Sequence, residues 1–294
     1  MKISSRKTFT CLFLSGLLPC LAFAQDPTLV PPPPVSTDVA AQRALHTHTI
    51  RYHKLSHYQA KLETDPAELQ ASCRFESAIS TPPPAKRIAL TFDDGPEPGE
   101  TEFILETLKR HNIRATFFMI GEHAKAHPEL VARVMAEGHH LIGNHSWDHP
   151  NFHSIGATQQ TSEVEMAQDV LKDSATERLF RYPFGNSTCD TNHLLQGSGY
   201  KIVGWHVDSC DWAFDRNETV DAKEAAACGV LPQFHSNYVG HVLSAIKARN
   251  GGIVLMHEIH PGTLRKLDAI IVAALAEGFT FGSIDEPDFA QSMR

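Results

Sequence analysis

The sequence lacks an excess of basic residues: 26 lysines and arginines stand against 34 aspartates and glutamates, for a formal net charge of -8. No basic cluster stands out, so we expect no nucleic-acid partner. With 42% hydrophobic and 20% charged residues, the chain also lacks the composition of a disordered or multi-span membrane protein. Histidine is abundant, at 18 residues, which directs attention to metal or proton chemistry.

No apolar run is long enough for a comfortable membrane span. The run from about Phe9 to Phe23 follows a short basic segment and ends in small residues at Ala24. This pattern predicts a cleaved secretory signal over residues 1–24, with a retained anchor as the alternative. We therefore expect a secreted or periplasmic protein without stable membrane insertion.

No Cys-x-x-Cys pair is present, so a zinc ribbon is not indicated. An even number of cysteines follows the predicted signal, which permits disulfides in an exported chain. The sequence leaves their pairing open, although a Cys210–Cys228 bond would close a short loop. The cysteines concerned are Cys73, Cys189, Cys210 and Cys228.

Two proline runs, at residues 31–34 and 82–84, enclose a segment with helical spacing of its apolar residues. This segment is too small for a domain of its own. We expect residues 25–85 to be a Pro-rich linker and helical extension, and residues 86–290 to be the main domain.

Within the main domain, short apolar strands alternate with segments of helical periodicity, which implies a parallel sheet with helical crossovers. The fold class is therefore α/β, and the number of units suits a distorted (β/α)7–8 barrel. The alternative is an open doubly wound sheet, but its usual GxGxxG is absent after the first strand. Strands are predicted at residues 87–91, 115–121, 141–143, 179–183, 200–207, 252–256 and 279–284.

Polar, ionisable side chains follow many of these predicted strands. In parallel α/β folds the carboxyl ends of the strands converge on one face, where active sites form. One such ending would be weak support for a site, but several together indicate one. The segments concerned are Asp93-Asp94, His145 to His149, Arg181 to Phe184, Asp208 to Trp212, and His257-Glu258.

A metal site is one expectation from these segments. His145 and His149 are four residues apart, so on a helical turn both imidazoles would face the same way. The glutamate of an HExxH motif is missing between them. An aspartate at a neighbouring strand end would supply a third ligand and leave positions open for water and substrate, as in catalytic sites.

Acid–base chemistry is the second expectation. Asp93 and Asp94 point in different directions at a strand end, so one can bind metal while the other faces the water, although Asp-Asp-Gly-Pro is also good turn chemistry. His257 is the candidate acid for an amine leaving group. Its carboxylate partner stays open among Asp208, Asp211 and Glu258. Arg181 would form a charge-assisted bond to one of the aspartates, and Trp212 could form an apolar wall.

Taken in order, these segments resemble the motifs of the polysaccharide deacetylases of carbohydrate esterase family four, the NodB-homology group. The resemblance extends from about Lys86 to Asp285. It implies a distorted (β/α) barrel with one divalent ion, usually zinc, although such a ligand set also accepts cobalt or nickel. The motifs are Thr91 to Gly95, His145 to His149, Arg181 to Phe184, Asp208 to Trp212, and Leu255 to His257.

The resemblance also implies roles for individual residues. Asp94, His145 and His149 resemble the metal ligands. Asp93 resembles the general base, held by Arg181, and His257 the general acid, tethered by Asp211. The backbone N–H near Phe184 resembles the oxyanion donor, and Trp212 and Phe184 would border the acetyl pocket. Glu258 stands where many members have aspartate.

The implied reaction is hydrolysis of N-acetyl groups on a glycan that contains N-acetylglucosamine, of peptidoglycan or chitin type. The alternatives are an O-acetyl esterase acting on xylan-like glycans and a non-catalytic glycan-binding protein. The N-acetylated glycan is the expected partner. The sequence identifies neither the polymer nor the oligomeric state, and the stretch 213–237 has no assigned role.

Overall fold

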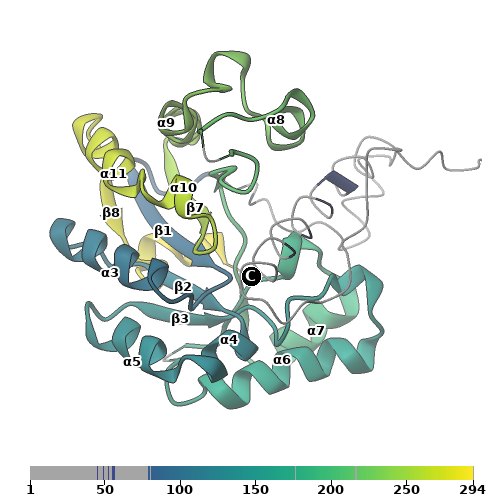
Figure 1. Cartoon of the computed structure of the whole chain (residues 1–294). Helices are drawn as coiled ribbons and strands as arrows, with labels where there is room; N and C mark the ends of the chain where they lie inside the picture. Colours follow the sequence, from purple (N-terminus) through teal and green to yellow (C-terminus); the bar gives the residue numbers. More distant parts are fainter. Residues whose placement is uncertain are drawn as a thin grey trace, which may run out of the picture. The chain divides into compact units, whose positions relative to one another are not determined.

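The computed structural model describes residues 81–175, 177–215 and 217–293, together with residues 45, 49, 52, 55, 56 and 79 (Figure 1). The predicted signal over residues 1–24 and most of the predicted extension 25–85 lie outside these residues. Among the described residues, no helix is both long enough and apolar enough to cross a membrane.

The core of the described fold is a parallel sheet, as the sequence predicts. Its strands are hydrogen-bonded in the order β5-β4-β3-β2-β1-β7-β6, and β8 pairs with β1 beside this path. Every ladder between these strands is parallel, which confirms the α/β class. The strands are β1 (Arg87–Asp93), β2 (Thr116–Met119), β3 (Leu141–Asn144), β4 (Leu179–Phe180), β5 (Lys201–Ile202), β6 (Val207–Asp208), β7 (Gly251–His257) and β8 (Thr280–Gly282).

Strand β1 is central to the sheet and directs the site residues. β7 pairs with it along its whole length, while β8 pairs with its first half and β2 with its second half. Alternate residues of a strand face opposite sides of a sheet. Ile88, Leu90 and Phe92 join the large core cluster that includes the helices, while Ala89 joins a separate cluster. Asp93 is four residues after Ala89 on the same strand and therefore faces the same side of the sheet.

Helices follow the strands and lie around the sheet (Figure 1). The apolar spacing of Leu264, Leu267, Ile271 and Ala274 predicts one helix, but the structure divides this segment into two. The α-helices are α3 (Glu100–His111), α4 (Gly121–Ala126), α5 (Pro128–Ala136), α6 (Ala157–Leu171), α7 (Cys189–Gly197), α8 (Ala222–Cys228), α9 (Tyr238–Arg249), α10 (Pro261–Leu264) and α11 (Leu267–Ala276). Short 3-10 turns are η1 (Phe152–Ser154), η2 (Pro183–Gly185), η3 (Pro232–Phe234) and η4 (Pro287–Ser292).

The predicted strand 200–207 differs from the structure, because it is two strands. β5 pairs with β4 at one end of the sheet path, and β6 pairs with β7 at the other. The Val203 N–H still donates to Phe180 O, and the His206 N–H donates to Ile253 O. The chain therefore crosses from one end strand to the other at Gly204 and Trp205. This crossing brings the two ends of the sheet together and accounts for the distorted barrel.

Candidate active site

Arg181 lies at this crossing and is 1% exposed. Its Nε donates to Val203 O at 3.2 Å and its Nη2 to Gly204 O at 3.0 Å. Its Nη1 lies 2.7 Å from both Thr91 Oγ1 and Asp93 Oδ1. The guanidinium thus joins the carbonyls of the strand crossing to the end of β1. Its fixed fork of donors is suited to this arrangement.

Two aromatic rings lie against the Arg181 guanidinium. Its central carbon is 4.1 Å from the ring centre of Phe118 and 5.7 Å from that of Trp205. Burial lowers the pKa of Arg181, and the charge and hydrogen bond of Asp93 oppose that shift. An arginine keeps its proton under such conditions. Asp93 is therefore held in one orientation by a buried ion pair.

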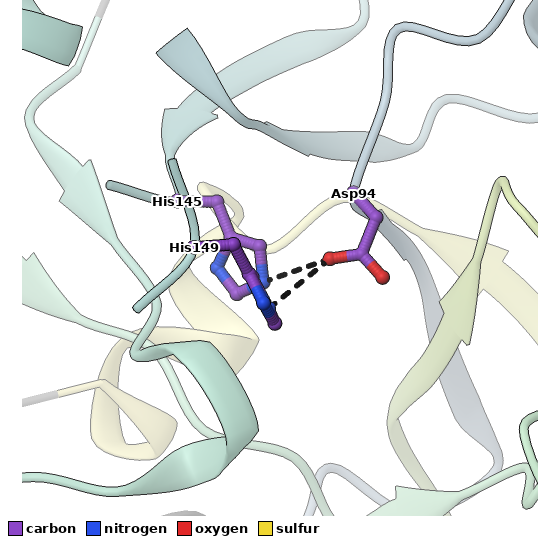
Figure 2. Close-up of side chains that lie close together, drawn as sticks. All are labelled: Asp94, His145 and His149. Carbon is purple, nitrogen blue, oxygen red and sulfur yellow. Dashed lines mark ion pairs between the residues drawn. The ribbon is translucent and has the colours of Figure 1, made fainter. Parts of the chain in front are cut away.

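The side chains of Asp94, His145 and His149 point toward one another (Figure 2). The Nε2 atoms of His145 and His149 lie 3.4 and 3.3 Å from the same oxygen, Asp94 Oδ1. All three residues are buried, and one ligand atom from each lies within 4.8 Å of the others. Asp93 Oδ2 lies 3.6 Å from His145 Nε2. The structure thus brings together residues that are 55 positions apart, from 94 to 149.

The surroundings of this group orient its ligand atoms. His145 Nδ1 lies 2.8 Å from Arg181 O, and a carbonyl can only accept, so Nδ1 carries the proton. The lone pair of Nε2 is then directed at Asp94. His123, from α4, contacts Asp94 O through Nδ1 at 2.9 Å. Histidine and carboxylate ligands fixed by such outer contacts are typical of catalytic divalent-metal sites, so the residues present fit a metal ion.

His257, at the end of β7, is held by Asp211. The two residues share a 2.7 Å contact between Nδ1 and Oδ1, and the His257 N–H donates to Asp211 Oδ2 at 2.7 Å. Burial opposes charging of His257, but the charge of Asp211 and its hydrogen bond raise the pKa of His257 from 6.5 to about 9. The imidazole is therefore protonated at neutral pH in the absence of a cation.

The carboxylate partner of His257 was left open by the residues alone, and the structure selects Asp211. Asp208 Oδ1 instead accepts from the backbone N–H of Cys210 at 2.9 Å. Glu258 is turned away and accepts from the Thr101 hydroxyl. Burial raises the pKa of Glu258 to about 8. The three carboxylates at this edge therefore have three different partners.

A pocket opens between these groups. Phe184 contacts His149, with ring centres 4.4 Å apart. Trp205 and Leu255 also line the pocket, whereas Trp212 is 1% exposed and packs in the large core cluster. The pocket is lined by Asp93, His145, His149, Tyr182, Phe184, Gly185, Trp205, Leu255 and His257.

The sequence reasoning did not identify Trp205 or His123 as contributors to the site. Trp205 falls inside a stretch that was predicted as continuous strand, so nothing marked it as a site residue. His123 belongs to α4, which the apolar spacing did not predict. Described residues of the stretch 213–237 form α8 and η3, and none of them lines the pocket.

The structure contains the disulfide Cys210–Cys228, the pairing that loop length had favoured. Cys189 is also disulfide-bonded. Asp208, Cys210 and Cys228 offer ligand atoms close to one another. Because both sulfurs are joined in the disulfide, they are not thiolates, and this group does not resemble a metal site.

Comparison with known proteins gives a consistent result. The family model described as polysaccharide deacetylase matches residues 80–203. A chitooligosaccharide deacetylase of Rhizobium leguminosarum bv. trifolii is 32% identical over 219 residues, which cover 68% of this chain and 91% of that protein. The peptidoglycan-N-acetylglucosamine deacetylase PgdA of Listeria monocytogenes is 35% identical over 203 residues. That match covers 68% of this chain but only 38% of PgdA.

Solved structures extend this likeness to the fold. The peptidoglycan N-acetylglucosamine deacetylase Bc1960, solved with a benzamide derivative, superposes with a TM-score of 0.58 at 26% sequence identity. The superposition covers 75% of this chain and 95% of that one. The similarity to named deacetylases therefore includes both the amino-acid sequence and the fold. The chain belongs to the polysaccharide deacetylase family.

Proposed function

We propose that this protein is a metal-dependent N-deacetylase that hydrolyses the acetamido group of N-acetylglucosamine units in a peptidoglycan-type or chitin-type glycan. The observation that carries the proposal is the pocket in which Asp93 and His257, each held by a charged partner, adjoin the metal-ligand histidines. The names of the relatives support this substrate class.

Asp94, His145 and His149 would hold one divalent cation, and the two histidines with one carboxylate favour zinc, with cobalt or nickel also accepted. A cation there would supply Lewis acidity and lower the pKa of water. The protein's own contribution is to fix the ligand atoms: the proton on His145 Nδ1 is committed to Arg181 O, so Nε2 remains a ligand.

Asp93 is the proposed general base. Its Oδ1 is occupied by Arg181, while its Oδ2 lies toward His145 and the pocket. The Oδ2 atom would accept the proton of the attacking water. Arg181 acts as a positioning residue, because it fixes the carboxylate without facing the pocket itself. General-base catalysis of this kind typically contributes ~10²–10⁴-fold in rate.

His257 is the proposed general acid. An amine leaves poorly from a tetrahedral carbon unless it is protonated, so the site needs a proton donor on the leaving-group side. Asp211 holds the proton of Nδ1, which leaves Nε2 to deliver a proton to the sugar nitrogen. The products would be acetate and a free amino sugar.

The aromatic and apolar lining provides the proposed contact for the acetyl methyl group. We propose Phe184 as a substrate-binding residue, with the backbone N–H near Phe184 as the oxyanion donor. Trp212, which the resemblance also suggests, packs in the core and does not line the pocket, so we assign it no contact with substrate. Trp205 and Leu255 line the pocket, so we add them to this surface. An exported location, secreted or periplasmic, is supported by the Cys210–Cys228 disulfide, because such bonds persist in oxidising compartments.

The proposal is tested by incubating the zinc-loaded protein with N-acetylated chitooligosaccharides and with muropeptides, and by following acetyl loss with mass spectrometry. We expect acetate release that Asp93→Asn and His257→Gln each lower by ~10²-fold or more. Asp173→Asn and His193→Gln, which change exposed residues of the same types, are the matched controls.

The same assay with acetylated xylan separates the alternatives. Acetate release from the O-acetylated glycan alone would replace the proposal with an esterase. Glycan binding without acetate release, at equal strength in Asp93→Asn, would replace it with a binding protein.

A further inference from the structure

The disulfide Cys210–Cys228 lies directly beside the residue that holds the proposed general acid. Cys210 precedes Asp211 in the loop after β6, and Cys228 is the last residue of α8. The bond therefore fastens the Asp211 loop to a helix that contributes nothing to the pocket lining. Cys210 is completely buried, so this attachment lies inside the core.

The backbone at Cys210 is in a conformation that side chains rarely adopt. Its φ is 60°, in the left-handed region that favours glycine. Asp208 Oδ1 accepts from the Cys210 N–H at 2.9 Å, and the Ala213 N–H donates to Cys210 O at 2.9 Å. The turn that carries Asp211 is thus fixed on both sides of the disulfide.

A further contact is made to the sulfur itself. His241, in α9, places Nε2 at 3.2 Å from Cys210 Sγ. A disulfide sulfur has no proton, so Nε2 is the donor. His241 is itself buried, at 5% exposure. α8 and α9 therefore both hold the Cys210 side chain, one through a covalent bond and the other through a hydrogen bond.

Asp211 depends on this turn for its alignment. It is completely buried and must meet both the ring and the backbone N–H of His257, each at 2.7 Å. Two such contacts restrict the carboxylate to a narrow range of positions. A displacement of about 1 Å at a catalytic group can cost on the order of 10²-fold in rate.

We propose that Cys210 and Cys228 are positioning residues for the general acid: their disulfide, with His241 on its sulfur, holds the turn that aligns Asp211 with His257. The proposal rests on the deacetylase function proposed above. It predicts that removal of the disulfide acts on the rate through Asp211 rather than through general loosening of the fold.

The test is a thermodynamic cycle with Asp211→Asn. We measure kcat and KM for the zinc-loaded wild type, Cys210→Ser/Cys228→Ser, Asp211→Asn and the triple variant, below the melting temperature of each. We expect the double cysteine variant to lose up to ~10²-fold in kcat, as a small displacement of a catalytic group can, with KM little changed. The triple variant should be no slower than Asp211→Asn. Losses that add would show a purely structural role and overturn the proposal.

A second test, by NMR spectroscopy, does not depend on enzymatic activity. The Nδ1 proton of His257, in its contact with Asp211, should give a downfield imidazole N–H resonance in wild type that is absent from His257→Gln. In Cys210→Ser/Cys228→Ser this signal should be lost or broadened while the fold, followed by circular dichroism, persists. An unchanged signal would overturn the proposal even if no glycan were deacetylated.

Should the serine variant fail to fold, Cys210→Ala/Cys228→Ala leaves no buried hydroxyl and serves in both tests. The disulfide of Cys189 is intact in every variant, so general loss of disulfides does not confuse the result. The wild-type protein could prove inactive on all glycans while the His257 signal is still lost or broadened in the double cysteine variant. That result would refute the proposed function and would support the positioning role of the disulfide.

Discussion

His257 and Asp211 contact each other twice, through the ring Nδ1 and through the backbone N–H of the histidine, and both contacts are 2.7 Å long. The aspartate therefore fixes the position as well as the charge of the ring. Because the pKa of His257 is raised from 6.5 to about 9, the stabilisation by this pair is complete below pH 6.5 and is lost as the pH rises through 9.

The first prediction concerns Asp211→Asn in the metal-free protein. Without the carboxylate charge of Asp211 and its hydrogen bond, burial opposes only the smaller raising effects of Asp94 and Asp93, so we expect the pKa of His257 to fall well below 9. The measurement is an NMR titration of the His257 ring carbons, with the exposed Asp173→Asn as the control. A pKa that stays near 9 in Asp211→Asn would show that another group holds the proton.

The second prediction concerns the buried carboxyl of Glu258, which keeps its proton until about pH 8. The unfolded chain ionises near pH 4.5, so the folded state becomes less favourable as the pH rises from 4.5 to 8. Glu258→Gln removes that cost and should add about 1–3 kcal/mol to the free energy of unfolding at pH 8, with little change at pH 4.5. Urea unfolding at pH 8 and at pH 4.5 measures this change in the free energy of unfolding, with the exposed Glu165→Gln as the control. An equal effect at both pH values would contradict the ionisation argument.

The third prediction concerns His140 and His206, which accept backbone N–H groups of Ala115 and Ile253 at Nδ1. Burial lowers the pKa of each to about 4. The unfolded chain takes up these protons as the pH falls below 6.5, so the free energy of unfolding should decline between pH 6.5 and 4. We expect His140→Gln and His206→Gln each to reduce that decline by on the order of 1–2 kcal/mol. Thermal unfolding measured between pH 6.5 and 4 tests this expectation, and the exposed His193→Gln should leave the decline in the free energy of unfolding unchanged.

The fourth prediction concerns Arg181→Lys. Lysine carries a single ammonium and cannot reach Asp93, Val203 O and Gly204 O together, so at least one buried partner is left unpaired. We expect a loss of about 3 kcal/mol in the free energy of unfolding and ~10²-fold in kcat. Urea unfolding and the deacetylation assay measure these, and the exposed Arg178→Lys is the matched control. If Arg181→Lys keeps the wild-type free energy of unfolding and the wild-type kcat, a positive charge alone is sufficient at this position.

The fifth prediction concerns the metal ion. His145→Gln removes a proposed ligand and should abolish retention of stoichiometric zinc on gel filtration. His123→Phe leaves the three proposed ligands in place but removes the contact to Asp94 O, and it should weaken zinc binding by ~10–100-fold. Competition with a chromophoric chelator gives both affinities, with His193→Gln as the control. Unchanged affinity in His145→Gln would exclude this ligand set.

The sequence predicts the parallel sheet and the segments that end its strands because both depend on local patterns. Apolar runs mark the buried strands, and the alternation of β1 separates Ile88 and Leu90 from Ala89 and Asp93. Residue type at the strand ends then indicates the chemistry. What the residues left open was the choice of partners, which depends on side-chain direction: Asp208 turns to a backbone N–H and Glu258 to Thr101.

The division of the predicted strand 200–207 was beyond sequence reasoning for a different reason. Residues on both sides of Gly204 have strand character. The first part of this segment pairs with β4 and the second part with β7, and the point of change depends on how the two ends of the sheet meet. Trp205 lines the pocket as a result of that crossing, whereas Trp212 lies in the core. Both outcomes depend on contacts between segments far apart in the chain.

One consequence of the crossing concerns mechanics. The guanidinium of Arg181 bonds to the carbonyls of Val203 and Gly204 and also to the carboxylate of Asp93. Any local opening that pulled β5 away from β6 would therefore also break the hydrogen bond between Arg181 and Asp93, the proposed general base. Partial unfolding at this edge and loss of turnover are then a single event, and amide hydrogen exchange at the crossing should track inactivation.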